Sequence, residues 1–256
     1  MNDKVEGIIL KQSDYKDSSL LLQVLTKEYG KIMLVANGAR KPTSKTASRL
    51  LPYTKNEFLF DYHEGKNMFR LKNLSLIQLY SNLHEDVEAS LASGVIGELA
   101  DVMTYEEYDY ENVYQLIDEA FYLLNEDKRS DLIIGIVLSN LMKMNGIGAN
   151  VDECTICQKK NVVAISAKDG GFLCASCAQS MHVQPRQVNE LKEFRLLSKA
   201  QLEHYDILHN LIEDGHPYID ILVEILRLHH GISLNSYHVY QSLLPFKNGN
   251  GALLQT

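Results

Sequence analysis

The hydrophobic pattern of the chain changes its period near residue 83, and this change restricts the folds open to it. Before that point, β-branched, aromatic and aliphatic residues gather in short runs typical of strands. After it, apolar residues recur every three or four positions, as at Val87, Leu91, Val95 and Leu99, which indicates an amphipathic helix. A chain of 256 residues can form one or two domains. We therefore predict an α+β protein with a β domain over residues 1–80, followed by helices.

The β domain is predicted to contain five strands, with Gly30 and Gly65 in two of the turns between them. Glycine supplies the positive φ that such turns require. Because the strands are short and closely spaced, the sheet should close into a small barrel, which hides its edges. The pattern alone leaves open an oligonucleotide-binding (OB) barrel or an SH3-like one. The predicted strands are Val5–Lys11, Ser19–Thr26, Lys31–Asn37, Asn56–Tyr62 and Asn67–Ile77.

The helical part is predicted to be a bundle that covers residues 81–149 and 181–245. Residues 132–144 are apolar nearly all round, as expected of a central helix, and Gly146 can provide its left-handed end. A later helix over 202–212 has Ser198 as a candidate N-cap. Another, over 219–228, lies between Pro217 and Gly231. The last residues, 246–256, are rich in glycine and asparagine and are predicted to be a flexible tail.

All four cysteines lie in the insert over residues 150–180, as two Cys-x2-Cys pairs: Cys154 with Cys157, and Cys174 with Cys177. Sixteen residues separate the pairs, and a hairpin over 162–173 would bring them together. This spacing is typical of a zinc ribbon, in which four thiolates hold one structural Zn²⁺. A disulfide or four unrelated thiols is the alternative, and a cytoplasmic setting disfavours disulfides. His182 is a weaker candidate ligand, which we leave out of the set.

The net charge of −8 conceals two regions of opposite sign. Residues 1–80 hold 13 Lys and Arg against 8 Asp and Glu, a net charge of +5. Residues 81–256 hold 12 against 25, a net charge of −13. Such asymmetry suggests that the first region contacts a polyanion, although surface charge also serves solubility.

Within the first region, no acidic residue occurs from Tyr29 to Asn56. Lys and Arg on a loop can bind phosphate and release its counterions, and aromatic rings can stack on bases. Five aromatic residues of the first region are candidates for such stacking: Tyr15, Tyr29, Tyr53, Tyr62 and Phe69. The alternative is that the aromatic residues belong to the barrel core and the cations to a solvated face. The candidate DNA-binding residues are Lys31, Arg40, Lys41, Lys45 and Arg49.

No pattern in the chain predicts an enzyme. There is no P-loop, and no carboxylate pair or nucleophile–base set can be placed together from the sequence. The longest apolar run is too short for a membrane helix, and no signal peptide is apparent, so we expect a cytoplasmic protein.

Several short segments carry a resemblance to a known family: Glu6-Gly7-Ile8-Ile9-Leu10, Leu25-Thr26-Lys27-Glu28-Tyr29-Gly30-Lys31, Ala36-Asn37-Gly38-Ala39-Arg40-Lys41, Leu51-Pro52-Tyr53 and Gly97-Glu98-Leu99. In this order, with a basic barrel before a helical bundle that a four-cysteine insert interrupts, they resemble the bacterial recombination mediator family RecO. The resemblance extends over nearly the whole chain.

The resemblance implies a five-stranded OB-fold barrel that binds single- and double-stranded DNA. It also implies a protein that anneals complementary strands, binds RecR and the C-terminal tail of single-stranded-DNA-binding protein (SSB), and helps to load RecA. Arg40, Lys41 and Lys45 match the DNA-contacting region of the family, and Lys31 and Arg49 lie beside it. A second hypothesis is a zinc-ribbon scaffold that binds proteins without binding DNA directly.

Overall fold

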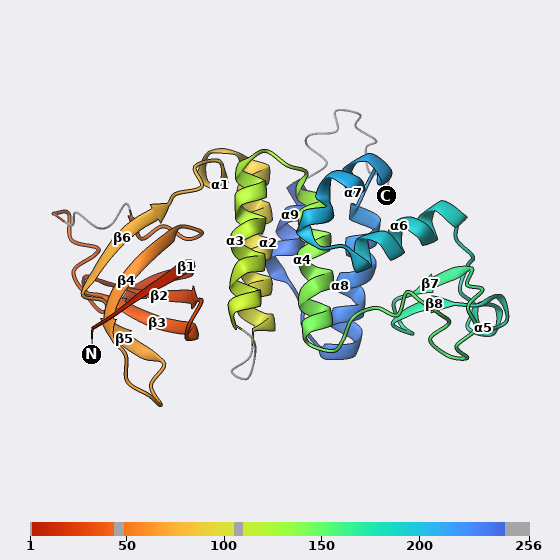
Figure 1. Ribbon diagram of the computed structural model, residues 1–256, viewed down its shortest axis with the longest axis horizontal. Coiled ribbons are helices and arrows are strands. Elements are labelled where there is room, and N and C mark those ends of the chain that lie inside the picture. The colour runs from red at the N-terminus through yellow and green to blue at the C-terminus, as the bar shows by residue number, and fades with distance from the viewer. Residues whose placement is uncertain (1, 44–48, 105–109, 244–256) are drawn as a thin grey trace, which may run out of the picture.

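The computed structural model describes residues 2–43, 49–104 and 110–243. Figure 1 shows three parts in a row: a curled β-sheet at one end, a bundle of helices in the middle, and a small hairpin with a short helix at the other end. This arrangement confirms the predicted α+β fold. Lys45 and the predicted tail over 246–256 lie outside the described residues. Among the helices of the described ranges, none is long and apolar enough to cross a membrane.

The β part is one sheet with the strand order β5-β3-β2-β1-β4-β6. Side chains alternate between its two faces, and the inward ones form a core that includes Ile9, Leu34 and Phe58. Four strands lie where the sequence predicts them, although β1 is longer at both ends. The bounds are β1 Asn2–Tyr15, β2 Ser19–Thr26, β3 Gly30–Ala36, β4 Lys55–Asp61, β5 Met68–Arg70 and β6 Asn73–Gln78.

The predicted fifth strand is divided in two, and this division closes the sheet. The Leu71 N–H donates to the carbonyl oxygen of Val35 on β3 at 3.0 Å. The N–H of the next residue, Lys72, donates to Leu59 on β4 at 2.8 Å. Strand β5 therefore pairs in parallel with β3 while β6 pairs antiparallel with β4, so that one segment joins the two ends of the sheet. This order is that of an OB-like barrel, which decides between the two barrels left open.

The helices surround α4 (Ser130–Met144), which is buried on every side for most of its length and packs against α2, α6 and α8. This confirms the predicted central helix, and Gly146 beyond it has φ +70°. Pro217 and Gly231 (φ +67°) lie at the two ends of α8, as expected. The other bounds are α1 Asn82–Glu85, α2 Val87–Met103, α3 Tyr110–Asn125, α6 Val188–Lys199, α7 Tyr205–Leu211, α8 His216–His230 and α9 Asn235–Leu243.

Among the helices of seven or more residues, α6 and α9 are not predicted by the hydrophobic pattern. The buried stripe of α6 is narrow, with Phe194 and Leu197 as its fully buried apolar residues, and most of the helix is polar. Ser198 lies inside α6, so its predicted role as an N-cap is wrong. A 3₁₀ turn over Leu202–His204 comes before α7.

The cysteine-bearing insert packs firmly on the bundle. It consists of β7 (Ala164–Ser166), β8 (Gly171–Leu173) and α5 (Ala175–Ser180), and the hairpin matches the predicted one. Phe172 is buried against Phe194 of α6, with ring centroids 5.8 Å apart. The insert is therefore held against the bundle by apolar packing.

The contacts between the barrel and the bundle include a partly buried ionic cluster and a close approach at a glycine. Lys55 Nζ lies 2.9 Å from Glu6 and 2.7 Å from Asp118 of α3. The ring of Tyr53 lies on Gly97 of α2, where a Cβ atom would approach its Cε1 to 2.7 Å. Glycine at 97 thus permits the barrel to approach the helix closely.

Candidate metal centre and nucleic-acid surface

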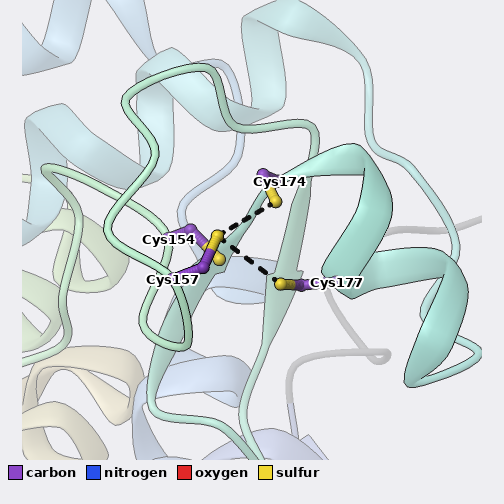
Figure 2. A group of neighbouring side chains, drawn as sticks. All are labelled: Cys154, Cys157, Cys174 and Cys177. Atoms are coloured by element: carbon purple, nitrogen blue, oxygen red, sulfur yellow. Dashed lines mark hydrogen bonds between the residues drawn. The ribbon is translucent and has the colours of Figure 1, made fainter.

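The four cysteines come from two structural elements that face each other. Figure 2 shows Cys154 and Cys157 on the loop before the hairpin, opposite Cys174 and Cys177 at the start of α5. Their four Sγ atoms all lie within 4.8 Å of one another. Cys157 Sγ is 3.5 Å from Cys174 and 3.6 Å from Cys177. The fold thus brings together all four predicted ligands.

These separations suit a single tetrahedral ion. With metal–sulfur bonds of about 2.3 Å, tetrahedral geometry places neighbouring sulfurs about 3.8 Å apart. The first pair is held in a tight turn, in which the Gln158 N–H donates to the Cys154 carbonyl at 2.8 Å and Gln158 takes φ +61°. In the second pair, the Ala178 N–H donates to Cys174 at 2.8 Å, which begins α5. The backbone therefore orders both Cys-x2-Cys turns.

Hydrogen bonds favour the thiolate form at two of the cysteines. The Ser176 hydroxyl, followed by the backbone of Cys177, lowers the pKa of Cys174 to about 6. Burial raises the pKa of Cys154, but backbone hydrogen bonds outweigh it and the net shift is downward. Burial and the neighbouring thiols raise the pKa of Cys177 to about 12. Four thiols so close together cannot all ionise without a cation to compensate their charge.

The donor set fits a closed, structural metal site. Four sulfur ligands fill a tetrahedral coordination shell and leave no position for a substrate. Cys154 and Cys174 are buried, whereas Cys157 is exposed at the edge of the cluster. His182 is exposed and does not belong to the group of ligand atoms that the described residues bring together.

A second group of possible ligands, formed by Asp131, Asp214 and His216, has a different role. Its ligand atoms also lie within 4.8 Å of one another. Both carboxylate oxygens of Asp131, however, accept hydrogen bonds from Arg129, at 3.1 and 2.6 Å. A guanidinium in that position repels a cation, and Arg129 also donates to the backbone carbonyl of Ile212 at 2.7 Å. This cluster therefore joins α4 to the turn before α8.

Three of the predicted DNA-binding residues lie on the loop surface, which we define as Arg40, Lys41 and Arg49. All three are exposed. Arg40 forms an ion pair with Asp14 of β1 at 2.9 Å, and its N–H donates to the Ser18 carbonyl at 2.9 Å. Lys41 and Arg49 form no ion pair with any residue that the structure describes. The side chains of Lys41 and Arg49 are exposed to solvent, and their contact with DNA stays a prediction.

Lys31 is separate from the loop surface. It lies at the start of β3, where its Nζ donates to the Asp101 backbone carbonyl and forms an ion pair with the Asp101 carboxylate at 3.1 Å. Gln23 donates to the same carboxylate. Direct contact between Lys31 and DNA stays a prediction, but the structure shows that its ammonium joins the barrel to α2.

Most of the aromatic residues considered for base stacking belong to the packing of the barrel. Phe69 is buried, and Tyr29 and Tyr62 stack on each other with centroids 4.1 Å apart beside the barrel core. Tyr53 packs on α2 and on Phe121 of α3. Tyr15 is half-buried at the β1–β2 turn, with Lys16 Nζ 5.3 Å from its ring centroid. The alternative in which these rings are structural holds for four of the five.

Two exposed cations, Lys66 and Arg70, were not selected from the sequence. They lie outside the acid-free stretch, and Glu64 is close to Lys66 in the chain. The alternation around Phe69, which is buried between exposed Met68 and Arg70, was the one signal that could have placed Arg70 on the outer face.

Comparisons with known proteins cover both parts of the chain. The family model "Recombination protein O N terminal" matches residues 1–80, and "Recombination protein O C terminal" matches residues 84–238. The chain is 28% identical over 183 residues to the DNA repair protein RecO of Caldicellulosiruptor bescii, which covers 71% of this chain and 74% of that protein. The RecO of Lactiplantibacillus plantarum is 25% identical over 254 residues, 94% and 97% of the two chains. The RecO of Exiguobacterium sibiricum is 30% identical over 175 residues, which cover 68% of this chain and 70% of that protein.

Proposed function

The chain belongs to the RecO family of DNA repair and recombination proteins, and from this premise we propose that it is a non-catalytic mediator that binds and anneals DNA strands. In this proposal it also helps to load RecA on single-stranded DNA coated with SSB. The barrel, residues 1–80, is the DNA-binding unit. The helical part, residues 81–149 and 181–245, binds RecR and the C-terminal tail of SSB. The protein works in the cytoplasm, on the DNA of the nucleoid.

The observation that carries DNA binding is the loop surface on an OB-like barrel. Lys41 and Arg49 are exposed and lack ion pairs among the described residues, so phosphate can reach them without displacing a carboxylate. With about four to six phosphate contacts, the log–log dependence of single-strand affinity on salt should have a slope of about −3 to −4.

The test is to reverse both charges in the full-length protein, as Lys41→Glu/Arg49→Glu. Binding to a single-stranded oligonucleotide should weaken at least about tenfold at low salt, and the salt slope should become shallower by about 1.4, because two phosphate contacts are lost. The matched control is Lys168→Glu/Lys192→Glu, two exposed lysines outside the barrel. Equal affinity of the loop variant and wild type would show that the loop surface does not bind DNA, and no binding by wild type would favour the scaffold hypothesis.

For the cysteine insert, residues 150–180, we propose one structural Zn²⁺ held by Cys154, Cys157, Cys174 and Cys177. The support is the donor set and the spacing of its sulfurs. When bound, the ion neutralises the crowded thiolates and contributes free energy of folding. Metal analysis should find one zinc per chain, and Cys154→Ser should lower both the zinc content and the melting temperature. A zinc content far below one, with an unchanged melting temperature after chelation, would refute the site.

The protein partners require a separate measurement. We expect the full-length protein to bind RecR and a peptide of the SSB C-terminal tail, and to speed RecA filament formation on SSB-coated single strands. Loss of this stimulation when the tail is deleted from SSB would support a direct contact. Stimulation that is equal with and without the tail would contradict it.

A further inference from the structure

A groove lies on the barrel where the last strands separate. It has a volume of about 560 Å³ and runs between the end of β4 and strand β5. Its polar lining comprises Asp61, His63, Lys66, Arg70 and Lys72. Strands β4 and β5 do not pair here, because the segment after β4 leaves the sheet at Tyr62 and returns at Met68 beside β3. We call this feature the seam groove.

The seam groove carries positive charge that is accessible to solvent. Lys66 and Arg70 are exposed, and neither forms an ion pair with a residue in the described ranges. The carboxylate in the groove, Asp61, is 2.6 Å from Lys72, whose hydrogen bond lowers the pKa of Asp61. This pair neutralises itself, which leaves the charges of Lys66 and Arg70 in excess. The groove therefore fits an anion with repeated charges.

The seam groove is separate from the loop surface. Arg40 is anchored by Asp14 and Ser18 at the β1–β2 turn, whereas the groove lies on β5. Strands β2 and β3 lie between this turn and β5, which at 4.7–4.9 Å per strand corresponds to about 10–14 Å across the sheet from the anchor of Arg40. At the end of these strands near the loop, the outward side chains are uncharged and half-buried: Leu21 pairs with Val35, and Met33 is the next outward residue on β3. The one outward cation of β3, Lys31, lies at the other end of the strand and is paired with Asp101. An uncharged strip thus divides two cationic surfaces.

We propose that the seam groove binds the phosphodiester backbone of a second DNA strand while the loop surface holds the first. This inference rests on the proposed function and adds a second site to it. The phosphates of the two strands lie on the two cationic surfaces, and the uncharged strip between them faces the bases. One barrel then offsets the repulsion between two polyanions that approach each other, which is the electrostatic requirement for annealing.

The experiment compares three double variants of the full-length protein: Lys66→Glu/Arg70→Glu in the groove, Lys41→Glu/Arg49→Glu in the loop surface, and the control Lys168→Glu/Lys192→Glu. The probes are a short oligothymidine, whose number bound per chain is measured at saturation in low salt, and a pair of complementary oligonucleotides, whose annealing rate is followed. Melting temperatures check folding, and Lys66→Gln/Arg70→Gln is the substitute if the charge-reversed groove variant does not fold.

We expect two oligothymidines per chain for wild type and the control, and one for the groove variant. The groove variant should keep the affinity of the first strand within twofold and lose at least tenfold in annealing rate. One strand per wild-type chain, or two per groove-variant chain, would overturn the second site and leave DNA binding at the loop surface intact. A groove variant that loses as much first-strand affinity as the loop variant would show one continuous site, and also overturns the inference. Absence of all binding by wild type would refute the proposed function itself.

Discussion

The barrel carries its cations in two settings, and the contrast distinguishes structural charges from available ones. On the side that faces the bundle, three lysines each pair with a carboxylate of α2 or α3: Lys27 with Glu111, Lys31 with Asp101 and Lys55 with Asp118. Elsewhere on the barrel, six exposed cations lack an ion pair within the described ranges: Lys11, Lys16, Lys41, Arg49, Lys66 and Arg70. The net charge of +5 over residues 1–80 includes the lysines that pair with the bundle as well as the cations without an ion pair. It therefore overstates the positive charge that a ligand can reach.

The largest effect should come from removing the best-buried of the bundle-facing charges, as Lys55→Met. Methionine keeps much of the volume but leaves Glu6 and Asp118 without their cation. Lys55 is 17% exposed and Asp118 24%. Loss of one partner from a fully buried pair costs about 3–5 kcal/mol, and this partial exposure reduces our expectation to about 2–3 kcal/mol. Urea denaturation of the full-length protein measures the change.

The matched control is Lys4→Met, in the same barrel. Lys4 pairs with Glu57 at 3.0 Å, but the two side chains are 67% and 41% exposed. Such a surface pair contributes about 0–1 kcal/mol. If the two variants lose equal stability, the ionic cluster around Lys55 has no special role in joining the barrel to the bundle.

A smaller loss is expected for Gly97→Ala, which tests the apolar side of the same junction. Alanine is the better helix former by about 0.8–1.0 kcal/mol, but its Cβ would lie 2.7 Å from Tyr53 Cε1. Tyr53 cannot move easily, because it has φ +62° and its ring also packs on Phe121. Overpacking of this kind costs about 1–3 kcal/mol, so the net loss should be about 1 kcal/mol.

Gly94→Ala is the control, one helical turn earlier. A Cβ there meets Tyr53 Oη only at 3.9 Å, so the better helix propensity should prevail and raise the melting temperature. A Gly97→Ala protein that is as stable as the Gly94→Ala protein would mean that the barrel is not held closely on α2.

The same junction shows how far the sequence could lead. The period change near residue 83 falls between the end of β6 at Gln78 and the start of α2 at Val87, because amphipathic periodicity is a local property. The cysteine spacing likewise predicted that the four sulfur atoms lie close together, since a hairpin places its two Cys-x2-Cys turns opposite each other. Lys31 shows the limit: it looks like its neighbours in the acid-free stretch, but its partner Asp101 is 70 residues away in the chain. No local pattern reports such a contact.

The family segments have a related explanation. Tyr53 and Gly97, from two segments that carry the resemblance, contact each other across the junction. Glu98, from the same segment as Gly97, accepts hydrogen bonds from the N–H groups of Asn235 and Ser236 at the start of α9. These motifs maintain the arrangement of the barrel and the helices, so their presence predicted the architecture better than it predicted which cations are available.

A still smaller and pH-dependent effect is expected for Glu6→Gln. Burial raises the pKa of Glu6, but hydrogen bonds from Lys55 and Tyr114 outweigh this effect, and the pKa of Glu6 is lower than that of an ordinary glutamate. A lowered pKa stabilises the folded state above the unfolded-state value, and this stabilisation is lost as the pH falls through the folded-state value. Because Glu6 is 41% exposed, the effect at pH 7 should be under about 1 kcal/mol.

The measurement is the difference in unfolding free energy between wild type and Glu6→Gln, followed from pH 7 to pH 3. The difference should be constant from pH 7 to about pH 5 and should shrink below pH 4.5, as wild-type Glu6 becomes protonated. A difference that grows as the pH falls would show that Glu6 is destabilised by its surroundings.

The smallest change in stability is expected for Lys41→Glu/Arg49→Glu, and it tests the other half of the comparison. Neither side chain has an ion pair to lose among the described residues, so the unfolding free energy should change by less than about 0.5 kcal/mol. DNA affinity should nevertheless fall at least about tenfold, since two phosphate contacts are replaced by repulsion. Lys55→Met should show the opposite pattern, a large loss of stability with little change in the affinity of the folded protein. If the loop variant instead loses about 2 kcal/mol, these cations are structural too, and the distinction between the two sides of the barrel fails.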